Sequence, residues 1–544
     1  MIIFRQVFLL ALLLPMISAC AQTVAAGAMP PQPDIPILTP FQPSEASLSP
    51  SPVYLPTAIP GLWIAPSAPD ELRLDAEKSA APLVDSREVA GIRLDLVTSR
   101  PAENSSTWIY ALAAAFPTVS DGVTFDELKA SWNGSAGGLL MTASTFDAMK
   151  PVFDNQPGKG VRIVAAQDLS AELWQERGTW AILPFEALEP RLKVLEIDGV
   201  SPLRKEFKVA AYPLVAYFRL EPEVVQLPVS NRDKLVTVLM TGTTALVRAI
   251  SYKMQTNGIT YPDRDIGDWL RSADILHISN EVAFSSECPA PDPYDGHLRF
   301  CSALSNIGLL DDIGVDVIEV SGNHVNDWGT SALLSTLDMY SQRNWPVYSG
   351  GANETLARQP AILEREGRKF AFVGCNAPGP DFAWAGADTP GAAKCGDYGW
   401  LVDEIRQLKA AGNIVIATLQ HYEYYTSEPQ PLQLEDFRRL SEAGADVVSG
   451  SQAHYSQAME FHSNGFIHYG LGNLFFDQMG IDYEDGTRTT NTRREFLDRY
   501  LFYDGKLISI ELLTAMLEDY SRPRPMTIEE RSAFLSEYFA ASGW

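Results

Sequence analysis

Short apolar runs alternate with amphipathic stretches along most of the chain. In the second half, seven apolar runs end at glycine or polar residues and are rich in branched side chains, which is typical of buried strands. These runs are 235–240, 275–279, 315–320, 370–373, 414–419, 447–449 and 466–469. Strands that alternate with helices predict a layered α/β fold in this half.

The segment 61–228 shows a similar alternation and predicts a separate, smaller α/β domain. We expect strands at 92–97 and 161–165, and helices at 107–115 and 170–176. The stretch from Trp180 to Gly199 resembles the late part of a periplasmic solute-binding protein. The sequence therefore predicts two α/β domains in succession.

The first 20 residues have the parts of a signal peptide. Arg5 precedes an apolar run, 7–16, that is too short to span a bilayer, and small residues precede Cys20. The ending Ile-Ser-Ala-Cys resembles the bacterial lipobox, which implies acylation of Cys20 and a lipid anchor in the bacterial cell membrane. Secretion with cleavage nearby, which would leave Cys20 incidental, is the alternative. Either interpretation places the protein outside the cytoplasm.

The composition then divides the chain into segments. Ten of the 31 residues from 30 to 60 are proline, which favours an extended linker without a core. The predicted segments are a signal peptide (1–20), a linker (21–60), a solute-binding-like domain (61–228), a second α/β domain (231–520) and a helical tail (521–544).

Export to an oxidising compartment makes disulfide bonds expected for the other four cysteines. Cys288 and Cys301 bracket one proline-containing loop, and Cys375 and Cys395 bracket another. Of the three connectivities that four cysteines allow, these two local bridges are the simplest. The chain has no Cys-x-x-Cys pair, which disfavours a zinc site.

A Gly-Asn-His motif follows the predicted strand 315–320. In Gly322-Asn323-His324, the amide oxygen of Asn323 suits a cation, and the imidazole of His324 suits acid–base chemistry. Gly-Asn-His at a strand end resembles the metallophosphoesterase signature. The longer form, which continues to Asp327 and Gly329, resembles the CapA family of poly-γ-glutamate capsule synthesis proteins, also called PGA_cap. Blocks at 350–374, 443–457 and 466–478 follow in the order and spacing of that family.

The resemblance implies a metallophosphoesterase-like layered α/β sandwich with a damaged site. Thr243 stands where the family has an aspartate, and Gln452 stands where it has a histidine. The candidates that remain are His324 and Asp327 as catalytic residues and Glu281, Asn323, His421 and His454 as metal ligands. This set suits one divalent ion, Mn, Fe or Zn, but lacks ligands for two. For His421 and His454 a structural role is an equal alternative.

The net charge of −26 repels phosphate backbones, which excludes nucleic acid as an expected partner. The resemblance implies a cell-surface protein for synthesis, export or processing of a capsule or poly-γ-glutamate-like polymer, with metal-dependent hydrolysis as the enzymatic hypothesis. Its expected partners are an anionic polymer or cell-envelope glycan and capsule-synthesis membrane proteins. The alternative is a non-catalytic ligand-binding or assembly lipoprotein, which Thr243 and Gln452 favour.

Overall fold

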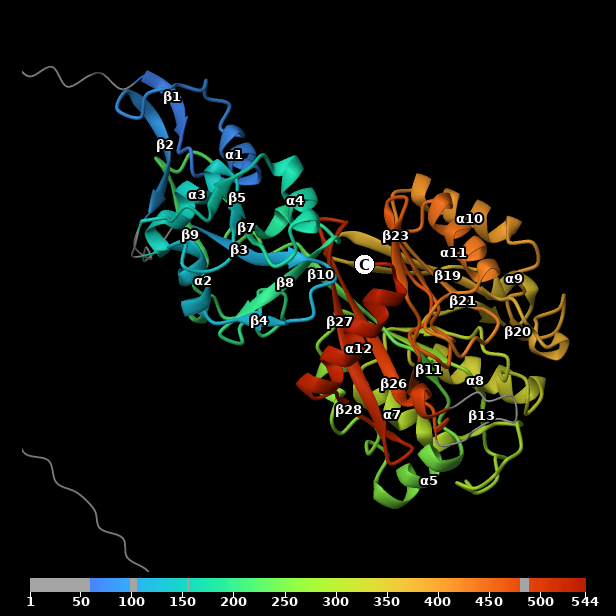
Figure 1. Cartoon of the computed structure of the whole chain (residues 1–544). Helices are drawn as coiled ribbons and strands as arrows, with labels where there is room; N and C mark the ends of the chain where they lie inside the picture. Colours follow the sequence, from blue (N-terminus) through green and yellow to red (C-terminus); the bar gives the residue numbers. More distant parts are fainter. Residues whose placement is uncertain (1–58, 98–104, 154–155, 480–488) are drawn as a thin grey trace, which may run out of the picture. The chain divides into compact units, whose positions relative to one another are not determined.

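A computed structural model describes residues 59–97, 105–153, 156–479 and 489–544 (Figure 1). The predicted signal peptide, Cys20 and most of the linker lie outside the described residues, so acylation stays a prediction. Residue contacts divide the chain into 1–55 and 56–544, and every element below belongs to the second part. Within the described ranges, no helix has the length and apolar character that crossing a bilayer requires.

One mixed sheet is built only from residues 59–221. Its strands are β1 (Ile59–Ile64), β2 (Ala90–Val97), β3 (Ser106–Ala115), β4 (Gly122–Val123), β5 (Leu139–Met141), β6 (Val161–Ile163), β7 (Trp180–Pro184), β8 (Leu192–Ile197) and β9 (Val215–Glu221). The main order is β1-β2-β9-β3-β7-β5-β6, and β8 pairs with β3 and β4. The helices are α1 (Asp70–Glu77), α2 (Phe125–Trp132), α3 (Ala143–Met149) and α4 (Leu169–Gln175).

Our prediction of a helix at 107–115 is wrong, because this segment belongs to strand β3. Its alanines and leucine favour a helix locally. However, β3 pairs with β9, β7 and β8, and nine of its ten residues are buried. Sheet pairing and burial therefore outweigh the local preference. The other three elements expected in this region correspond to β2, β6 and α4.

Two further sheets are built only from residues 235–525, and all seven predicted strands are present. The strands of the larger sheet are β10 (Leu235–Met240), β11 (Thr243–Thr244), β12 (Ile275–Asn280), β15 (Val317–Glu319), β16 (Val347–Tyr348), β25 (Asn473–Phe475), β26 (Arg494–Tyr503), β27 (Lys506–Glu518) and β28 (Arg522–Pro525). Those of the smaller sheet are β18 (Ala361–Arg365), β19 (Arg368–Asn376), β21 (Ile414–Gln420), β22 (Val447–Ser449), β23 (Met459–His462) and β24 (Gly465–His468). Short pairs add β13 (Phe284–Ser285), β14 (Ser302–Ala303), β17 (Gly350–Gly351) and β20 (Gly391–Ala392).

The main orders are β16-β15-β12-β10-β26-β27-β28 in the larger sheet and β18-β19-β21-β22-β24-β23 in the smaller one. Neighbours β10, β12, β15 and β16 are parallel, as are β19, β21, β22 and β24. The helices of this region are α5 (Arg248–Asn257), α6 (Gly267–Arg271), α7 (Ile307–Ile313), α8 (Thr330–Gln342), α9 (Glu354–Ala357), α10 (Gly399–Ala410), α11 (Pro431–Ala443) and α12 (Ile528–Ala541).

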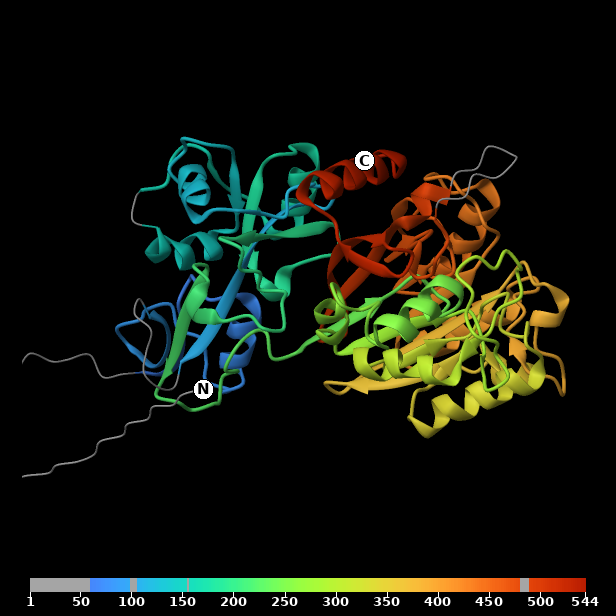
Figure 2. The same cartoon turned by 90° about the horizontal axis from the view of Figure 1, so that it is seen from below.

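The two sheets face each other across a shared apolar core. Along β10, Val236, Val238 and Met240 face this inter-sheet core, whereas Leu239 between them faces the helices on the other side. Helices α5, α7 and α8 cover the outer face of the larger sheet, and α10 and α11 cover that of the smaller sheet (Figures 1 and 2). The predicted layered α/β class is therefore confirmed.

Residues 522–541 complete this sandwich. Strand β28 pairs with β27, and α12 buries Phe534, Leu535 and Tyr538 in the inter-sheet core. Thr527 begins α12 through a reciprocal capping box with Glu530. The division of the chain into domains stays a prediction.

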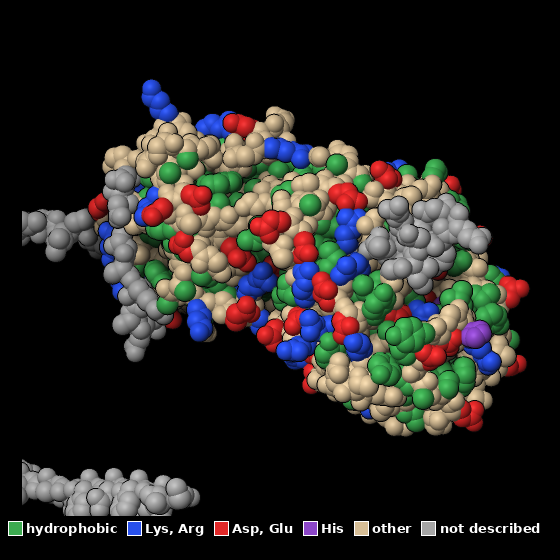
Figure 3. Space-filling view, turned by 60° about the horizontal axis from the view of Figure 1, so that its bottom comes forward, with side chains coloured by type: hydrophobic (Ala, Val, Ile, Leu, Met, Phe, Trp, Pro, Cys, Tyr) green, Lys and Arg blue, Asp and Glu red, His purple; other side chains and the backbone are tan. Residues whose placement is uncertain are grey.

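Charges of both signs are mixed on the surface. On the face in Figure 3, Lys and Arg side chains lie among Asp and Glu side chains. The net charge of −26 is therefore not gathered into one acidic patch on this face.

Candidate functional site

The candidate residues follow the carboxyl ends of neighbouring parallel strands. Strand β11 pairs with both β12 and β25, and the backbone N–H of Glu281 donates to the carbonyl of Thr244 at 2.9 Å. The loop after β15 lies directly against the end of β12, because a Cβ added at Gly322 would be 2.6 Å from the Glu281 Cα. The Gly-Asn-His loop thus requires a residue without a side chain at its first position.

Glu281 and His454 form a buried acid–imidazole pair. His454 Nε2 lies 3.6 Å from Glu281 Oε1 and 3.8 Å from Glu423 Oε1. The other ring nitrogen, Nδ1, lies 2.8 Å from Asn473 Oδ1. Burial lowers the pKa of His454, but the charges of Glu281 and Glu423 outweigh it and raise that pKa to about 9. The two carboxylates therefore favour the protonated form of the His454 imidazole.

His324 is held by Asp327 from the same loop. His324 Nδ1 lies 2.6 Å from Asp327 Oδ2, which also accepts the backbone N–H of Phe300 at 2.8 Å. Burial lowers the pKa of His324, but Asp327 and Glu281 outweigh it, so the pKa lies above its ordinary value. This arrangement leaves Nε2 of His324 available for proton transfer. Asp327 orients His324 and the Phe300 backbone.

Arg248 is a site residue that the sequence motifs missed. Its guanidinium makes a paired contact with the Asp477 carboxylate and lies over the rings of Phe300 and Phe476, at 4.8 and 5.4 Å. Asp477 also accepts the backbone N–H of Ala249 at 2.8 Å. Asp477 thereby fixes the start of α5 and the position of the Arg248 charge. Burial raises the pKa of Glu281, but the charges of His454, His324 and Arg248 outweigh it, so that pKa lies below its ordinary value.

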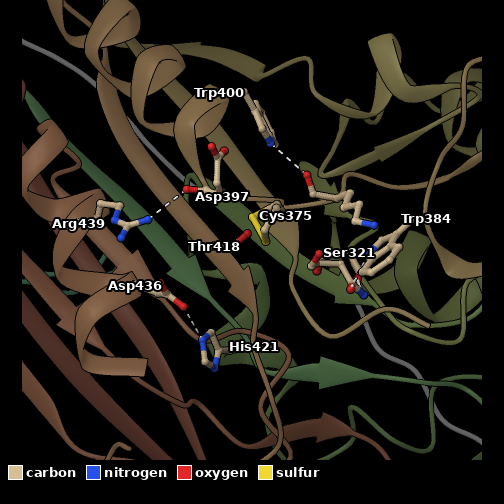
Figure 4. The surroundings of a disulfide bond; sticks show 12 residues. Ser321, Cys375, Trp384, Asp397, Trp400, Thr418, His421, Asp436 and Arg439 are labelled. Carbon is tan, nitrogen blue, oxygen red and sulfur yellow. Dashed lines mark hydrogen bonds and ion pairs between the residues drawn. A yellow bond between two sulfur atoms is a disulfide. The ribbon is translucent and has the colours of Figure 1, made fainter. Parts of the chain in front are cut away.

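His421 directly follows β21 and is held by Asp436 of α11 (Figure 4). Its Nε2 is 3.0 Å from Asp436 Oδ2, and burial lowers its pKa. Across the described ranges, no hydrogen bond or ion pair joins His421 to Glu281 or His454. These contacts match the structural alternative, and a ligand role for His421 stays a prediction.

The two positions that depart from the family pattern are buried. Gln452 donates its side-chain N–H to Ser279 Oγ, which ties its loop to β12. Thr243 is fully buried and its hydroxyl group has no hydrogen-bond partner. Neither side chain replaces the charge of the missing carboxylate or imidazole.

A single divalent cation fits the donor chemistry better than two. Both carboxylate oxygens of Glu281 and the side-chain oxygens of Asn323 and Gln452 are buried without hydrogen-bond partners. Such oxygens, with the imidazole of His454, are suitable cation ligands. In the part of the chain that the structure describes, no three His, Cys, Asp or Glu side chains are grouped to hold a metal. A cation here would therefore depend on amide oxygens.

The four cysteines lie at disulfide distance in the predicted pairs. The sulfur atoms are 2.04 Å apart in Cys288–Cys301 and 2.06 Å apart in Cys375–Cys395. The loop closed by the first pair borders a cleft of about 340 Å³ that Arg248 and Phe300 also line. Phe300 belongs to this loop, and its ring lies 4.5 Å from that of His324 between centroids.

Comparisons with known proteins match the segment that carries these residues. Residues 237–478 match the family model described as bacterial capsule synthesis protein PGA_cap. Capsule biosynthesis protein CapA of Bacillus anthracis is 22% identical over 326 residues, 58% of this chain and 77% of that protein. PGA biosynthesis protein CapA of Bacillus subtilis (strain 168) is 27% identical over 211 residues, 38% of this chain and 55% of that protein. The match thus spans little more than half of the second relative.

Two solved structures show a distant likeness to this chain. A putative 5'-nucleotidase from Staphylococcus aureus has a TM-score of 0.33 and 13% identity, with 57% of this chain and 58% of that chain covered. An ABC-type phosphate transport receptor from Vibrio cholerae has a TM-score of 0.24 and 10% identity, with 29% and 85% covered. The resemblance to the PGA_cap family is confirmed over residues 237–478.

Proposed function

We propose that this chain, with its PGA_cap segment at 237–478, takes part in the synthesis, export or processing of a capsule polymer of the poly-γ-glutamate type. The observation that supports this most is that the matched segment contains Glu281, His324 and His454, which surround one site. The two CapA relatives are named for capsule and PGA biosynthesis. We extend that role to this chain.

We further propose that the protein acts outside the cytoplasm, held to the membrane through acylated Cys20. Two cysteine pairs at disulfide distance support an oxidising compartment. The partners would be an anionic polymer or an envelope glycan, together with capsule-synthesis membrane proteins. The mixed charges in Figure 3 leave basic side chains available for an acidic polymer.

The proposed chemistry is hydrolysis of a γ-glutamyl amide. Water adds to the carbonyl carbon, the C–N bond breaks, and a proton passes to the leaving nitrogen. His324 Nε2 is suited to that transfer because Asp327 holds the opposite ring nitrogen. Glu281, Asn323 and His454 would hold a divalent cation, which when bound polarises a carbonyl group and acidifies water.

The test compares chain length of poly-γ-glutamate after incubation with wild type, His324→Ala and His462→Ala. His462 is the matched control because it is a part-buried imidazole paired with Glu442, in β23 rather than in a site loop. We expect shortening with wild type and His462→Ala, and at least a hundredfold slower shortening with His324→Ala. Equal rates for all three proteins would reject His324 as the acid–base group.

A non-catalytic ligand-binding or assembly role is the second candidate, and Thr243 and Gln452 favour it. Both are uncharged where a metal centre would gain from a carboxylate and an imidazole. Metal analysis and calorimetric titration with Mn²⁺ and γ-glutamyl oligomers separate the two functions. Oligomer binding without a stoichiometric metal and without shortening would support the binding role and reject the hydrolase.

A further inference from the structure

A fully buried carboxylate lies beneath the site, where the inter-sheet core meets the site loops. Glu319 ends strand β15 and is 0% exposed. The hydroxyl groups of Ser321 and Thr418 each donate to Glu319 Oε1 at 2.7 Å, and the hydroxyl of Ser451 donates to Oε2. His277 Nε2 lies 3.3 Å from Oε2. Both oxygens of this carboxylate are thus engaged.

These donors come from separate parts of the fold. Ser321 begins the loop that carries Asn323 and His324, and Ser451 begins the loop that leads to His454. Thr418 belongs to β21 in the opposite sheet, where it lies beside Cys375 of the neighbouring strand β19 (Figure 4). One carboxylate therefore contacts both site loops and bridges the two sheets.

The energetics favour a fixed arrangement. Burial raises the pKa of Glu319, but the hydrogen bonds from His277, Ser451 and Ser321 outweigh it, so that pKa lies below its ordinary value. Hydrogen bonds to a charged group are stronger than those between neutral groups. Displacing either loop would break one of these bonds and leave part of a buried charge unsatisfied.

We propose that Glu319 is a positioning residue that fixes loop 321–324 relative to loop 450–454, and so places His324 against His454 and Glu281. A second hydrogen bond supports this proposal. The side-chain N–H of Gln452, in loop 450–454, donates to the hydroxyl of Ser279, and Ser279 on β12 is the strand partner of Glu319 on β15. The inference concerns the geometry of the site and holds whichever function that site has.

The test is amide hydrogen exchange, followed by mass spectrometry, in the whole chain. Glu319→Gln keeps the shape of the side chain but replaces one acceptor by a donor, and we expect at least tenfold faster exchange in both 321–327 and 451–456. Glu495→Gln is the matched control, because Glu495 is equally buried in the same sheet but its carboxyl group has no hydrogen-bond partner. It should not accelerate exchange in either loop.

Two milder variants separate positioning from a general loss of stability. Ser321→Ala should accelerate exchange in 321–327 alone, and Ser451→Ala in 451–456 alone. Each serine variant should add little when Glu319→Gln is already present, because the shared bond is already lost. Uniform acceleration across the chain, or serine variants that leave their own loops unchanged, would overturn the proposal. Polymer shortening is not measured, so failure of the proposed hydrolysis does not alter this result.

Discussion

Glu495 on β26 should make the protein lose stability as the pH rises above about 4.5. The residue is 0% exposed, and neither carboxyl oxygen has a hydrogen-bond partner. Burial therefore raises the Glu495 pKa well above its ordinary value of 4.5, and the charge of Arg493 opposes this only in part. The folded protein keeps a proton here that the unfolded chain releases.

The magnitude follows from this difference in proton binding. A raised pKa in the folded state stabilises fully below pH 4.5, and the contribution is lost as the pH rises toward the folded-state pKa. The loss is about 1.4 kcal/mol for each pH unit in that interval, or about 3 kcal/mol over two units. Glu495→Gln removes this titration. The unfolding free energy of the variant minus that of wild type should therefore grow by about 1.4 kcal/mol for each pH unit in that interval.

The assay is urea unfolding followed by tryptophan fluorescence at pH 5, 6, 7 and 8. The control is Glu529→Gln, which changes an exposed glutamate in the first turn of α12 and should stay within about 0.5 kcal/mol of wild type. If the unfolding free energies of wild type and Glu495→Gln run parallel from pH 5 to 8, then Glu495 is not a buried protonated acid and the reasoning fails.

Three other predictions follow from the site and its supports. Gly322→Ala should lower the free energy of unfolding in urea by about 1–3 kcal/mol, because its Cβ would lie 2.6 Å from Glu281 Cα. Gly296→Ala is the control, since no atom lies within 4 Å of its Cβ, and equal urea midpoints for the two variants would contradict the close approach at Gly322. Asp477→Ala should lower the free energy of unfolding by about 3 kcal/mol, because it leaves Arg248 unpaired. Adding Arg248→Met should restore part of this loss, and a double variant no more stable than Asp477→Ala would argue against the pair. Thiol titration of the denatured, unreduced protein should find Cys288, Cys301, Cys375 and Cys395 unreactive, and two or more reactive thiols among them would show that a bridge is open.

The sequence predicted the strands of the second half well, because its apolar runs are short and each ends at glycine or polar residues. His324 and Glu281 could be proposed as site residues because they directly follow two of these strands, and their roles stay predictions. Arg248 could not, because its partner Asp477 lies 229 residues away and no local pattern joins them. Glu319 was also missed, since a glutamate within an apolar strand reveals its role only through hydroxyl groups supplied by other elements. The prediction of a helix at 107–115 was wrong because the alanines of β3 favour a helix locally, whereas pairing with neighbouring strands, which the sequence does not show, makes it a strand.

The family segment 237–478 ends before the elements that complete its own core. The edge of β10 that faces away from β12 is paired with β26, and α12 closes the space between the sheets. A fragment cut at the family limits would expose the backbone edge of β10 and the apolar side chains that α12 covers. Such a fragment is expected to aggregate. The sandwich can close only after residues up to 541 have been synthesised, so the growing chain keeps its inter-sheet core open until α12 is present.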